Sequence, residues 1–516
     1  MELFAFVLYF VAMLGVGLFF FFKSKSTINS EKEYFLGNRS MGPWVTAMSA
    51  QASDMSGWLL MGFPGSILAF GLGKVWIGIG LGLGTIANWL IVAKRLRRFS
   101  RASGDAITLP QYLTNRFASK SLVLKIVCSV IFLISFTVYV SSSFVAGKNV
   151  MCAVIPGLQD KEMLAMGIFA IIILVYTFFG GFKAVCWTDF FQGILMLIAL
   201  LAVPIIMATG NFDYSYSGAF AENITPFGTN PFTADWREIV TGLSWGLGYF
   251  GMPHIIIRFM SIKKPSMIKK SATVAIIWVI LTLGAAIAIA ILGRTFLLND
   301  GSSLAAKLIP ANAQQDIFIT VVQSIFPGLL AGLLLAAIVA AAMSTADSQL
   351  LVASSAFTSD IYKPLIRKGN AKEKEILWVG RIVVLIVSVL AFFIAASGIA
   401  DKNSWANSIM SMVENAWGLF GASFGPVVIL SLFWKRFNYA GACAGIITGA
   451  VVDIAWLLLF TNTIMPAIIT NFGIYEILPG FVASTIIAVI ISLITKAPSK
   501  DVEQLFANAT DNSIDD

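Results

Sequence analysis

Stretches of about 20 mostly apolar residues recur along the whole chain, separated by charged or Pro/Gly-rich breaks. An α-helix of this length matches the hydrocarbon thickness of a bilayer. Apolar residues make up 58% of the sequence and charged residues only 12%, which is more apolar surface than a soluble core can hide. The sequence therefore predicts an all-α polytopic membrane protein. Thirteen ranges fit a spanning helix: 3–22, 43–68, 74–93, 122–146, 163–180, 186–209, 238–258, 272–293, 324–345, 377–398, 406–432, 439–460 and 475–495.

Lysines and arginines gather on one side of this predicted arrangement. An odd number of spans puts the two termini on opposite sides. With the N-terminus outside, 28 of the 35 Lys and Arg residues fall in cytoplasmic loops or in the helix ends beside them. The positive-inside rule thus favours thirteen transmembrane helices with the N-terminus outside. The net charge of +8 follows from this topology and does not indicate nucleic-acid binding.

The hydrophilic segments are too short to form a soluble domain, since the longest spans about 25 residues. The acidic end, 497–516, is predicted to be a disordered cytoplasmic tail. No acid/base pair, nucleophile motif or phosphate loop is present, so we expect no enzyme. His254 is the only histidine and the four cysteines lack CxxC spacing, which argues against a histidine or cysteine metal site. The glycine-rich run 78–84 lies within a span and predicts close helix packing.

Two predicted spans are interrupted in a similar way. "QASDMSG" (51–57) breaks the second span, and "GLSWGLGYFGMPH" (242–254) breaks the seventh. Paired interruptions in corresponding positions indicate the substrate site of a secondary transporter. Because the two breaks are five spans apart, we expect a ten-helix core of two inverted five-helix repeats. The expected divisions are a first helix and loop (1–42), two core repeats (43–235 and 236–433), two peripheral helices (434–496) and the tail (497–516).

Polar residues at membrane depth mark candidate ion-binding positions. Asp54 lies in the first break, where a carboxylate costs at least ~2.5 kcal/mol on insertion scales. Ser344 and Thr345 are adjacent hydroxyls in an alanine-rich span. Such hydroxyls commonly bond back to their own helix. Two hydroxyls together with carbonyls freed by a broken helix would also suit sodium, and the nearby break favours this second interpretation.

Four aromatic residues form the third candidate cluster: Trp58, Tyr139, Trp245 and Tyr249. Membrane aromatics usually form interfacial belts, but two of these flank the predicted breaks near mid-membrane. Their apolar faces could hold a small organic solute, and their polar hydrogens could hold its carboxylate.

Five stretches resemble the sodium:solute symporter family: "YFLGNRSMGPWVTAMSAQASDMSGWLLMGFPG", "ITLPQYLTNRF", "YTFFGGFKAVCWTDFFQG", "GLGYFGMPHIIIRFM" and "AAMSTADSQLLVASSAFTSDIY". Their order and length extend the resemblance through almost the whole chain. It implies thirteen helices, a ten-helix inverted-repeat core, and sodium-coupled uptake of a small solute across a bacterial plasma membrane. The family's proline branch implies L-proline as that solute, with no obligatory protein partner.

The resemblance also implies residue roles, which we retain as expectations. Sodium would be held by the backbone carbonyls of Ala52, Met55 and Ala341 and by the hydroxyls of Ser344 and Thr345. The solute pocket would comprise Ser56, Trp58, Tyr139, Trp245, Tyr249 and Pro253. Coupling or gating roles fall to Arg39, Asp54 and Asp189.

Two alternatives remain at this point. The solute could be another small amino acid or a monocarboxylate, and a membrane sensor or channel is the alternative from a different class. Asp347, Glu414 and Asp453 have no role assigned by the sequence.

Overall fold

The computed structural model describes residues 1–24, 30–179, 181–210, 228–298, 310–461 and 472–511. Within these ranges the chain is helical and forms no strand. The α-helices are α1 (Glu2–Ser24), α2 (Glu31–Leu36), α3 (Pro43–Asp54), α4 (Phe63–Phe70), α5 (Val75–Ala87), α6 (Lys94–Ala102), α7 (Leu109–Arg116), α8 (Val123–Val154), α9 (Glu162–Phe179), α10 (Phe182–Thr209), α11 (Trp236–Ser244), α12 (Pro253–Ser261), α13 (Ile268–Leu298), α15 (Ile317–Ile325), α16 (Gly328–Phe357), α17 (Glu373–Ala400), α18 (Ile409–Phe433), α19 (Tyr439–Phe460), α20 (Ile477–Ile494) and α21 (Lys500–Thr510).

Tighter or wider helical turns join several of these helices: η2 (Trp58–Gly62), η3 (Leu72–Lys74), η4 (Asn88–Ala93), η7 (Trp245–Phe250) and η10 (Thr358–Ile366). Nine helical segments of the described chain are long and apolar enough to cross a membrane, and three apolar helices are shorter, at Glu2–Gly17, Trp58–Phe70 and Glu162–Phe178. The prediction of an all-helical membrane protein is therefore confirmed. The predicted span 324–345 is misplaced, because Pro327 caps α16, which continues to Phe357.

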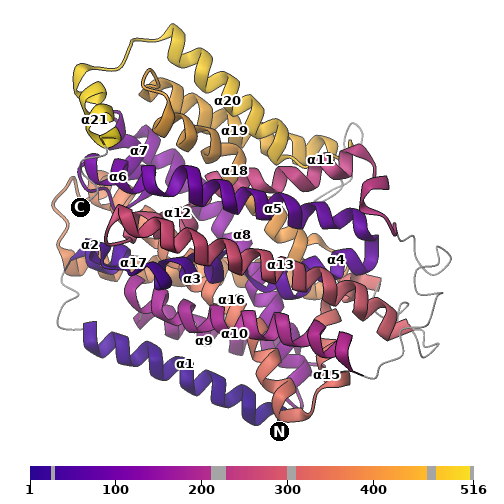
Figure 1. Cartoon of the computed structure of the whole chain (residues 1–516). Coiled ribbons are helices and arrows are strands. Elements are labelled where there is room, and N and C mark those ends of the chain that lie inside the picture. The colour runs from indigo at the N-terminus through magenta and orange to yellow at the C-terminus, as the bar shows by residue number, and fades with distance from the viewer. Residues whose placement is uncertain (25–29, 180, 211–227, 299–309, 462–471, 512–516) are drawn as a thin grey trace.

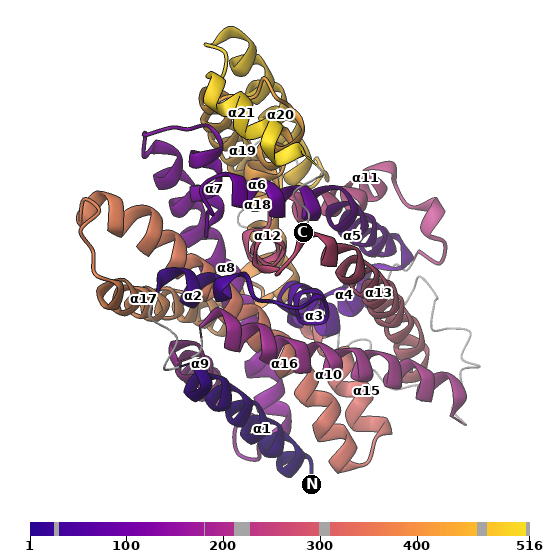
Figure 2. The same cartoon turned by 60° about the vertical axis from the view of Figure 1, so that its left-hand side comes forward.

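The long helices cross Figure 1 from side to side, with α2, α6 and α21 at one end and α4 and α15 at the other. Helix α16 packs against α8, α10, α1 and α17, and α18 packs against α8, α19 and α20. In the apolar windows of α16 and α18, 83% of the residues are buried, against 33% in α19 and 28% in α20. Figure 2 shows α19 and α20 projecting at one edge.

Both predicted helix breaks are present. Helix α3 ends at Asp54, and Met55 leaves the helical region with φ −83° and ψ 77°. Helix α11 ends at Ser244, the chain tightens through η7, and Met252 is extended with φ −75° and ψ 108° before Pro253 starts α12. Each break frees backbone carbonyls that need other partners inside a membrane.

The glycine-rich run 78–84 lies in α5 and packs directly on the second break. A Cβ on Gly80 would lie 2.2 Å from the carbonyl oxygen of Gly242, and one on Gly84 would lie 2.4 Å from that of Gly246. Only glycine permits helix backbones to approach this closely. The prediction of close helix packing is confirmed.

The prediction of a disordered tail is wrong for residues 500–510, which form α21 against α6. Ser499 caps the helix by accepting from Val502 N. The ring of Phe506 lies 5.0 Å from the guanidinium of Arg116 and 5.6 Å from that of Arg95. Cation–π contacts of Phe506 with Arg116 and Arg95 therefore hold α21 in place, although its composition alone predicted a solvated, disordered segment. Residues 512–516 lie outside the described part.

Candidate functional site

The backbone freed at the first break is satisfied by aromatic side chains. The carbonyl of Asp54 accepts hydrogen bonds from Trp58 Nε1 at 3.2 Å, Tyr139 Oη at 3.3 Å and the Ser56 backbone N–H at 3.0 Å. The carboxylate Oδ2 of Asp54 accepts from Tyr249 Oη at 2.6 Å. Asp54 therefore ties three of the four predicted aromatic residues to the point where α3 ends.

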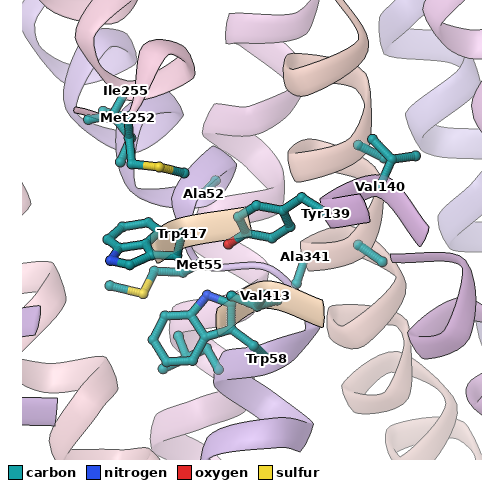
Figure 3. Packing of buried hydrophobic residues seen from close by; sticks show 14 of the residues in the cluster. Ala52, Met55, Trp58, Tyr139, Val140, Met252, Ile255, Ala341, Val413 and Trp417 are labelled. Atoms are coloured by element: carbon teal, nitrogen blue, oxygen red, sulfur yellow. The ribbon is translucent and has the colours of Figure 1, made fainter. Parts of the chain in front are cut away.

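This cluster is fully enclosed, since Trp58, Tyr139, Trp245 and Tyr249 are each no more than 1% exposed. Figure 3 shows Trp58, Tyr139 and Trp417 around Met55, with Ala52 and Ala341 beside them. Aromatic faces supply apolar walls, and the indole and phenol hydrogens supply polar contacts. Side chains of this kind suit contact with a small molecule that has both an apolar ring and a polar group.

The second break has its own polar supports, and one of them comes from a residue that the sequence did not single out. Trp417 on α18 donates from Nε1 to the carbonyl of Trp245 at 2.8 Å, and its ring lies 5.0 Å from that of Tyr249. Asn88 Nδ2 donates to the carbonyl of Tyr249 at 2.9 Å. The position of Trp417 also explains why residue 248 is a glycine, because a Cβ there would lie 1.9 Å from the Trp417 indole nitrogen.

Two of the predicted sodium carbonyls meet one of the predicted hydroxyls. Ser344 Oγ lies 2.7 Å from the carbonyl oxygen of Ala52 and 3.2 Å from that of Ala341. The neighbouring Thr345 hydroxyl is buried and has no hydrogen-bond partner. The end of α3 and the middle of α16 therefore bring together oxygen atoms of the hard, uncharged kind that suit a sodium ion. Met55 follows directly after α3, at the residue where the backbone leaves the helix.

Asp189 lies on α10 and forms a buried ion pair with Arg258 on α12. Its Oδ2 is 3.1 Å from Arg258 Nη2 and accepts from Ser49 Oγ at 2.6 Å. Arg258 also donates to Ser49 Oγ, to the carbonyl of His254 and to the hydroxyl of Ser348. Both partners are at most 1% exposed. The network joins α3, α10, α12 and α16.

Arg258 was missed as a site residue because the sequence prediction counted it, as the last residue of the span 238–258, among the topology-setting charges on the cytoplasmic side. The structure instead places it inside the α12 helix, within a buried network. The available signal was its position, which follows three isoleucines and precedes Phe259 and Met260 in "HIIIRFM" without a break. An arginine enclosed by apolar residues at that depth needs an acidic partner.

Arg39 lies near the ends of α6 and α12, away from the aromatic cluster. It donates from Nε to Asp105 Oδ1 at 2.6 Å, from Nη2 to the Ala106 carbonyl at 2.8 Å, and from Nη1 to the carbonyl of Met260. Lys32 pairs with the same Asp105 carboxylate. Partial burial alone would raise the pKa of Asp105, but the two cations outweigh it and lower the pKa below its usual value.

Pro253 and Ser56 occupy the breaks themselves. Pro253 is the first residue of α12, where a missing backbone N–H costs nothing. Ser56 Oγ lies 3.4 Å from the backbone nitrogen of Trp58, at the start of the turn that resumes the helix. Both residues are buried and shape the chain beside the aromatic cluster.

Three acidic residues left open by the sequence lie in two places. Asp347 is fully buried on α16, and both of its carboxylate oxygens lack a hydrogen-bond partner. It interacts electrostatically with Asp189 and Arg258. Glu414 on α18 and Asp453 on α19 lie together elsewhere, near the start of α20.

The helix breaks, the buried aromatic cluster and the oxygen-rich contact between α3 and α16 define a membrane transporter of the broken-helix class. Residues 34–449 match the Sodium:solute symporter family, which is most of the chain. The protein belongs to this family, and so it is a transporter that couples sodium to a solute.

Two curated relatives come from staphylococci. A protein of Staphylococcus saprophyticus named sodium/proline symporter 2 is 42% identical over 504 residues, covering 96% of this chain and 93% of the relative. A sodium/proline symporter of Staphylococcus aureus is also 42% identical, over 503 residues and with the same coverage.

Two solved structures share the fold. A sodium-coupled sialic acid symporter, solved in a substrate-bound outward-open state, superposes with a TM-score of 0.73 at 20% identity, covering 96% of this chain and 98% of that one. A nucleobase-cation-symport-1 family transporter, solved in a closed conformation, gives a TM-score of 0.53 at 13% identity, covering 93% of this chain and 99% of that one.

Proposed function

We propose that this protein is a sodium/proline symporter that takes up L-proline across a bacterial plasma membrane. The observation that carries this proposal is the 42% identity, over 96% of the chain, to relatives named sodium/proline symporters. The buried aromatic cluster supports the same solute. A pyrrolidine ring would lie against apolar aromatic faces, and its carboxylate would find indole and phenol donors.

The proposed topology has thirteen transmembrane helices with the N-terminus outside. The two short α3–η2–α4 and α11–η7–α12 segments would each count as one broken span. The five spans from residue 43 to 235 and the five from 236 to 433 would form the inverted repeats, and α19 and α20 would remain peripheral. The distribution of lysines and arginines supports this orientation. The equivalent places of the two breaks support the repeat.

Sodium is proposed to bind between α3 and α16. Its ligands would be the carbonyls of Ala52, Met55 and Ala341 and the hydroxyls of Ser344 and Thr345. The partnerless hydroxyl of Thr345 and the contact of Ser344 with two of these carbonyls support this set. An ion there would join the end of α3 to α16 and fix the backbone that carries the solute pocket.

Asp54 would act beside both sites. Its carboxylate accepts from Tyr249, so its structural contact is with the proposed solute pocket. Sodium bound to the adjacent carbonyl of Ala52 would therefore favour the pocket conformation that holds proline, which is the linkage required for symport.

Arg39 and Asp189 would close the cytoplasmic side. Arg39 precedes the first repeat and contacts Asp105 in that repeat and Met260 in the second, and Asp189 joins the two repeats by pairing with Arg258. Opening the inner path requires these segments to separate, so breaking these contacts would accompany release of the solute and sodium.

Moving one sodium ion with net-neutral proline transfers one charge. A membrane potential of ~100 mV contributes about 2.3 kcal/mol and a tenfold sodium gradient adds ~1.4 kcal/mol. Together they would support accumulation on the order of several hundredfold.

The proposal is tested with purified protein in liposomes. An inward sodium gradient should drive uptake of labelled proline, and an inside-negative potential should increase it. Equal uptake with potassium in place of sodium would rule out sodium coupling. Competition by unlabelled amino acids and monocarboxylates identifies the solute, and a stronger competitor than proline would overturn the substrate assignment.

The sodium site is tested in the same assay. Thr345→Ala should raise the sodium concentration for half-maximal uptake. Ser355→Ala is the matched control, because Ser355 is a buried hydroxyl of the same helix that bonds only to its own backbone, at Val352. A change in proline affinity at saturating sodium, without a change in sodium dependence, would contradict this role for Thr345.

A further inference from the structure

Two buried carboxylates face one small space between α18, α19 and α20. Asp453 is 1% exposed and Glu476 is 2% exposed. Oδ1 of Asp453 and Oε1 of Glu476 have no hydrogen-bond partner. Neither residue forms an ion pair with a described lysine or arginine. These are two acidic groups in a membrane interior without the neutralising contact that such groups require.

Gly418 keeps the space between them open. The point where a Cβ on Gly418 would lie is 3.1 Å from Asp453 Oδ1 and 3.3 Å from Glu476 Oε1. The two oxygens are therefore no more than 6.4 Å apart, the sum of these distances. Both carboxylates aim at a point on α18 that has no side chain.

A vestibule open to bulk solvent reaches one member of the pair, Glu476. It comprises two adjoining cavities of 550 Å³ and 210 Å³, at the end of the molecule where α4 ends and α18 begins. Six residues line both cavities: Phe70, Lys74, Thr241, Ser408, Ser411 and Glu414. Glu476 lines the larger cavity and Trp245 lines the smaller one. In the proposed orientation the vestibule faces outward, so Glu476 connects the outer solution to the deeper Asp453.

The residue next to the pair, Tyr475, contacts the proposed solute pocket. Tyr475 precedes Glu476, and its ring packs at a tilt of 34° against that of Trp245, with centroids 5.0 Å apart. The Tyr475 hydroxyl donates to the backbone carbonyl of Glu414 at 2.7 Å. A change in the charge of Glu476 therefore acts one residue from the aromatic ring that packs on Trp245.

The occupant that fits best is a proton. The described residues contain no group of three or more Asp, Glu, His or Cys side chains able to hold a metal ion. Two carboxylates a few ångströms apart cannot both stay ionised in a buried place without a cation, and a single proton relieves the repulsion. We propose that Asp453 and Glu476 form a proton-binding pair, loaded from the outer vestibule, which makes transport depend on external pH.

Other ionisable groups near the pair do not supply the missing cation. Glu414 adds a third negative charge from α18 and interacts with Lys74. Lys74 is itself paired with Glu238 at 3.1 Å. Arg237 on α11 stacks over Phe472 at 5.5 Å, at the rim of the vestibule. Tyr475 is a further titratable neighbour of the pair.

The first test observes the proton directly and does not depend on transport. Infrared difference spectra of the purified protein in liposomes, recorded as the external pH is varied, should show the C=O stretch of a buried protonated carboxyl. Asp453→Asn and Glu476→Gln should each remove that band. The control Asp160→Asn alters an exposed loop acid and should leave it intact. A band that persists in both variants, or that is displaced by sodium at constant pH, would overturn the proposal.

The second test uses uptake and rests on the proposed sodium/proline symport. Sodium-driven proline uptake by the unmodified protein should change at least severalfold between external pH 5.5 and 8.5, and Glu476→Gln should abolish that dependence. Gly418→Ala fills the space without changing a charge and should shift the pH of the transition. An unchanged pH profile in both variants would refute the link to transport.

The two proposals fail in distinguishable ways. If the protein does not carry proline but the carboxyl band disappears in Asp453→Asn and Glu476→Gln, the proton site stands and the proposed function does not. If uptake is normal and the band is unaffected, only the proton site is refuted.

Discussion

Replacing Arg258 with methionine would leave the Asp189 carboxylate without its cation inside the helical bundle. The two groups lie 3.1 Å apart and are at most 1% exposed. Removing one partner of a buried ion pair costs roughly 3–5 kcal/mol, because the remaining charge is uncompensated. Arg258 also holds Ser49 and the His254 carbonyl by hydrogen bonds, so we expect the loss to lie toward the upper end.

The double variant Arg258→Met with Asp189→Asn separates the ion pair from the other effects. It removes both charges of the pair, so its free energy of unfolding should be higher than that of Arg258→Met alone. The coupling energy of the two substitutions should be about 2–3 kcal/mol, the upper part of the range for residues in contact.

The measurement is unfolding in mixed detergent micelles with increasing dodecyl sulfate, followed by tryptophan fluorescence. Arg237→Met is the matched control, because Arg237 is exposed and should cost no more than about 0.5 kcal/mol. A loss below about 1 kcal/mol for Arg258→Met, together with zero coupling to Asp189, would refute a buried, directly paired network.

Three further predictions concern other contacts. Tyr249→Phe removes the 2.6 Å hydrogen bond to the Asp54 carboxylate. The dissociation constant for proline at saturating sodium, measured by calorimetry, should therefore rise about 10- to 100-fold. An unchanged constant would place the pocket elsewhere. The lowered pKa of Asp105 stabilises the fold above its unfolded pKa of ~3.9, and this contribution is lost as the pH falls below that value. Asp105→Asn should therefore reduce thermal stability at pH 7, by an amount that shrinks as the pH falls through the lowered pKa of the folded state, whereas a deficit that does not change with pH would exclude the pairing with Arg39. Phe506→Ala should speed the proteolytic cleavage of peptide bonds within α21. If the variant and the unmodified protein are cleaved there at equal rates, the Phe506 ring does not hold that helix.

The place of the aromatic residues near the breaks could be predicted from the sequence, but their common partner could not. Glycine, serine and proline weaken a helix wherever they stand, so the interruptions at Asp54 and before Pro253 are local properties. The hydrogen bond between Tyr249 and Asp54 joins residues 195 positions apart and depends on how two helices pack.

Charged residues show more clearly which properties are local and which depend on packing. Lysines and arginines near span ends predict orientation, because crossing the membrane is costly for any such charge. The same counting placed Arg258 at the cytoplasmic end of a span, whereas α12 continues through it and buries it against Asp189. Composition does not distinguish a charge that sets topology from one that completes a buried ion pair, because that depends on whether an acidic partner lies beside it in the folded protein.

The sequence by itself determined the helical membrane class, the places where the helices break and the family. These properties depend on hydrophobic runs, local backbone preference and contiguous motifs. Only the tertiary structure decided that Trp417 supports the second break, that α21 folds onto α6, and that Asp453 and Glu476 face Gly418. Each of these contacts joins distant segments whose approach is set by packing, and packing depends on the whole bundle at once.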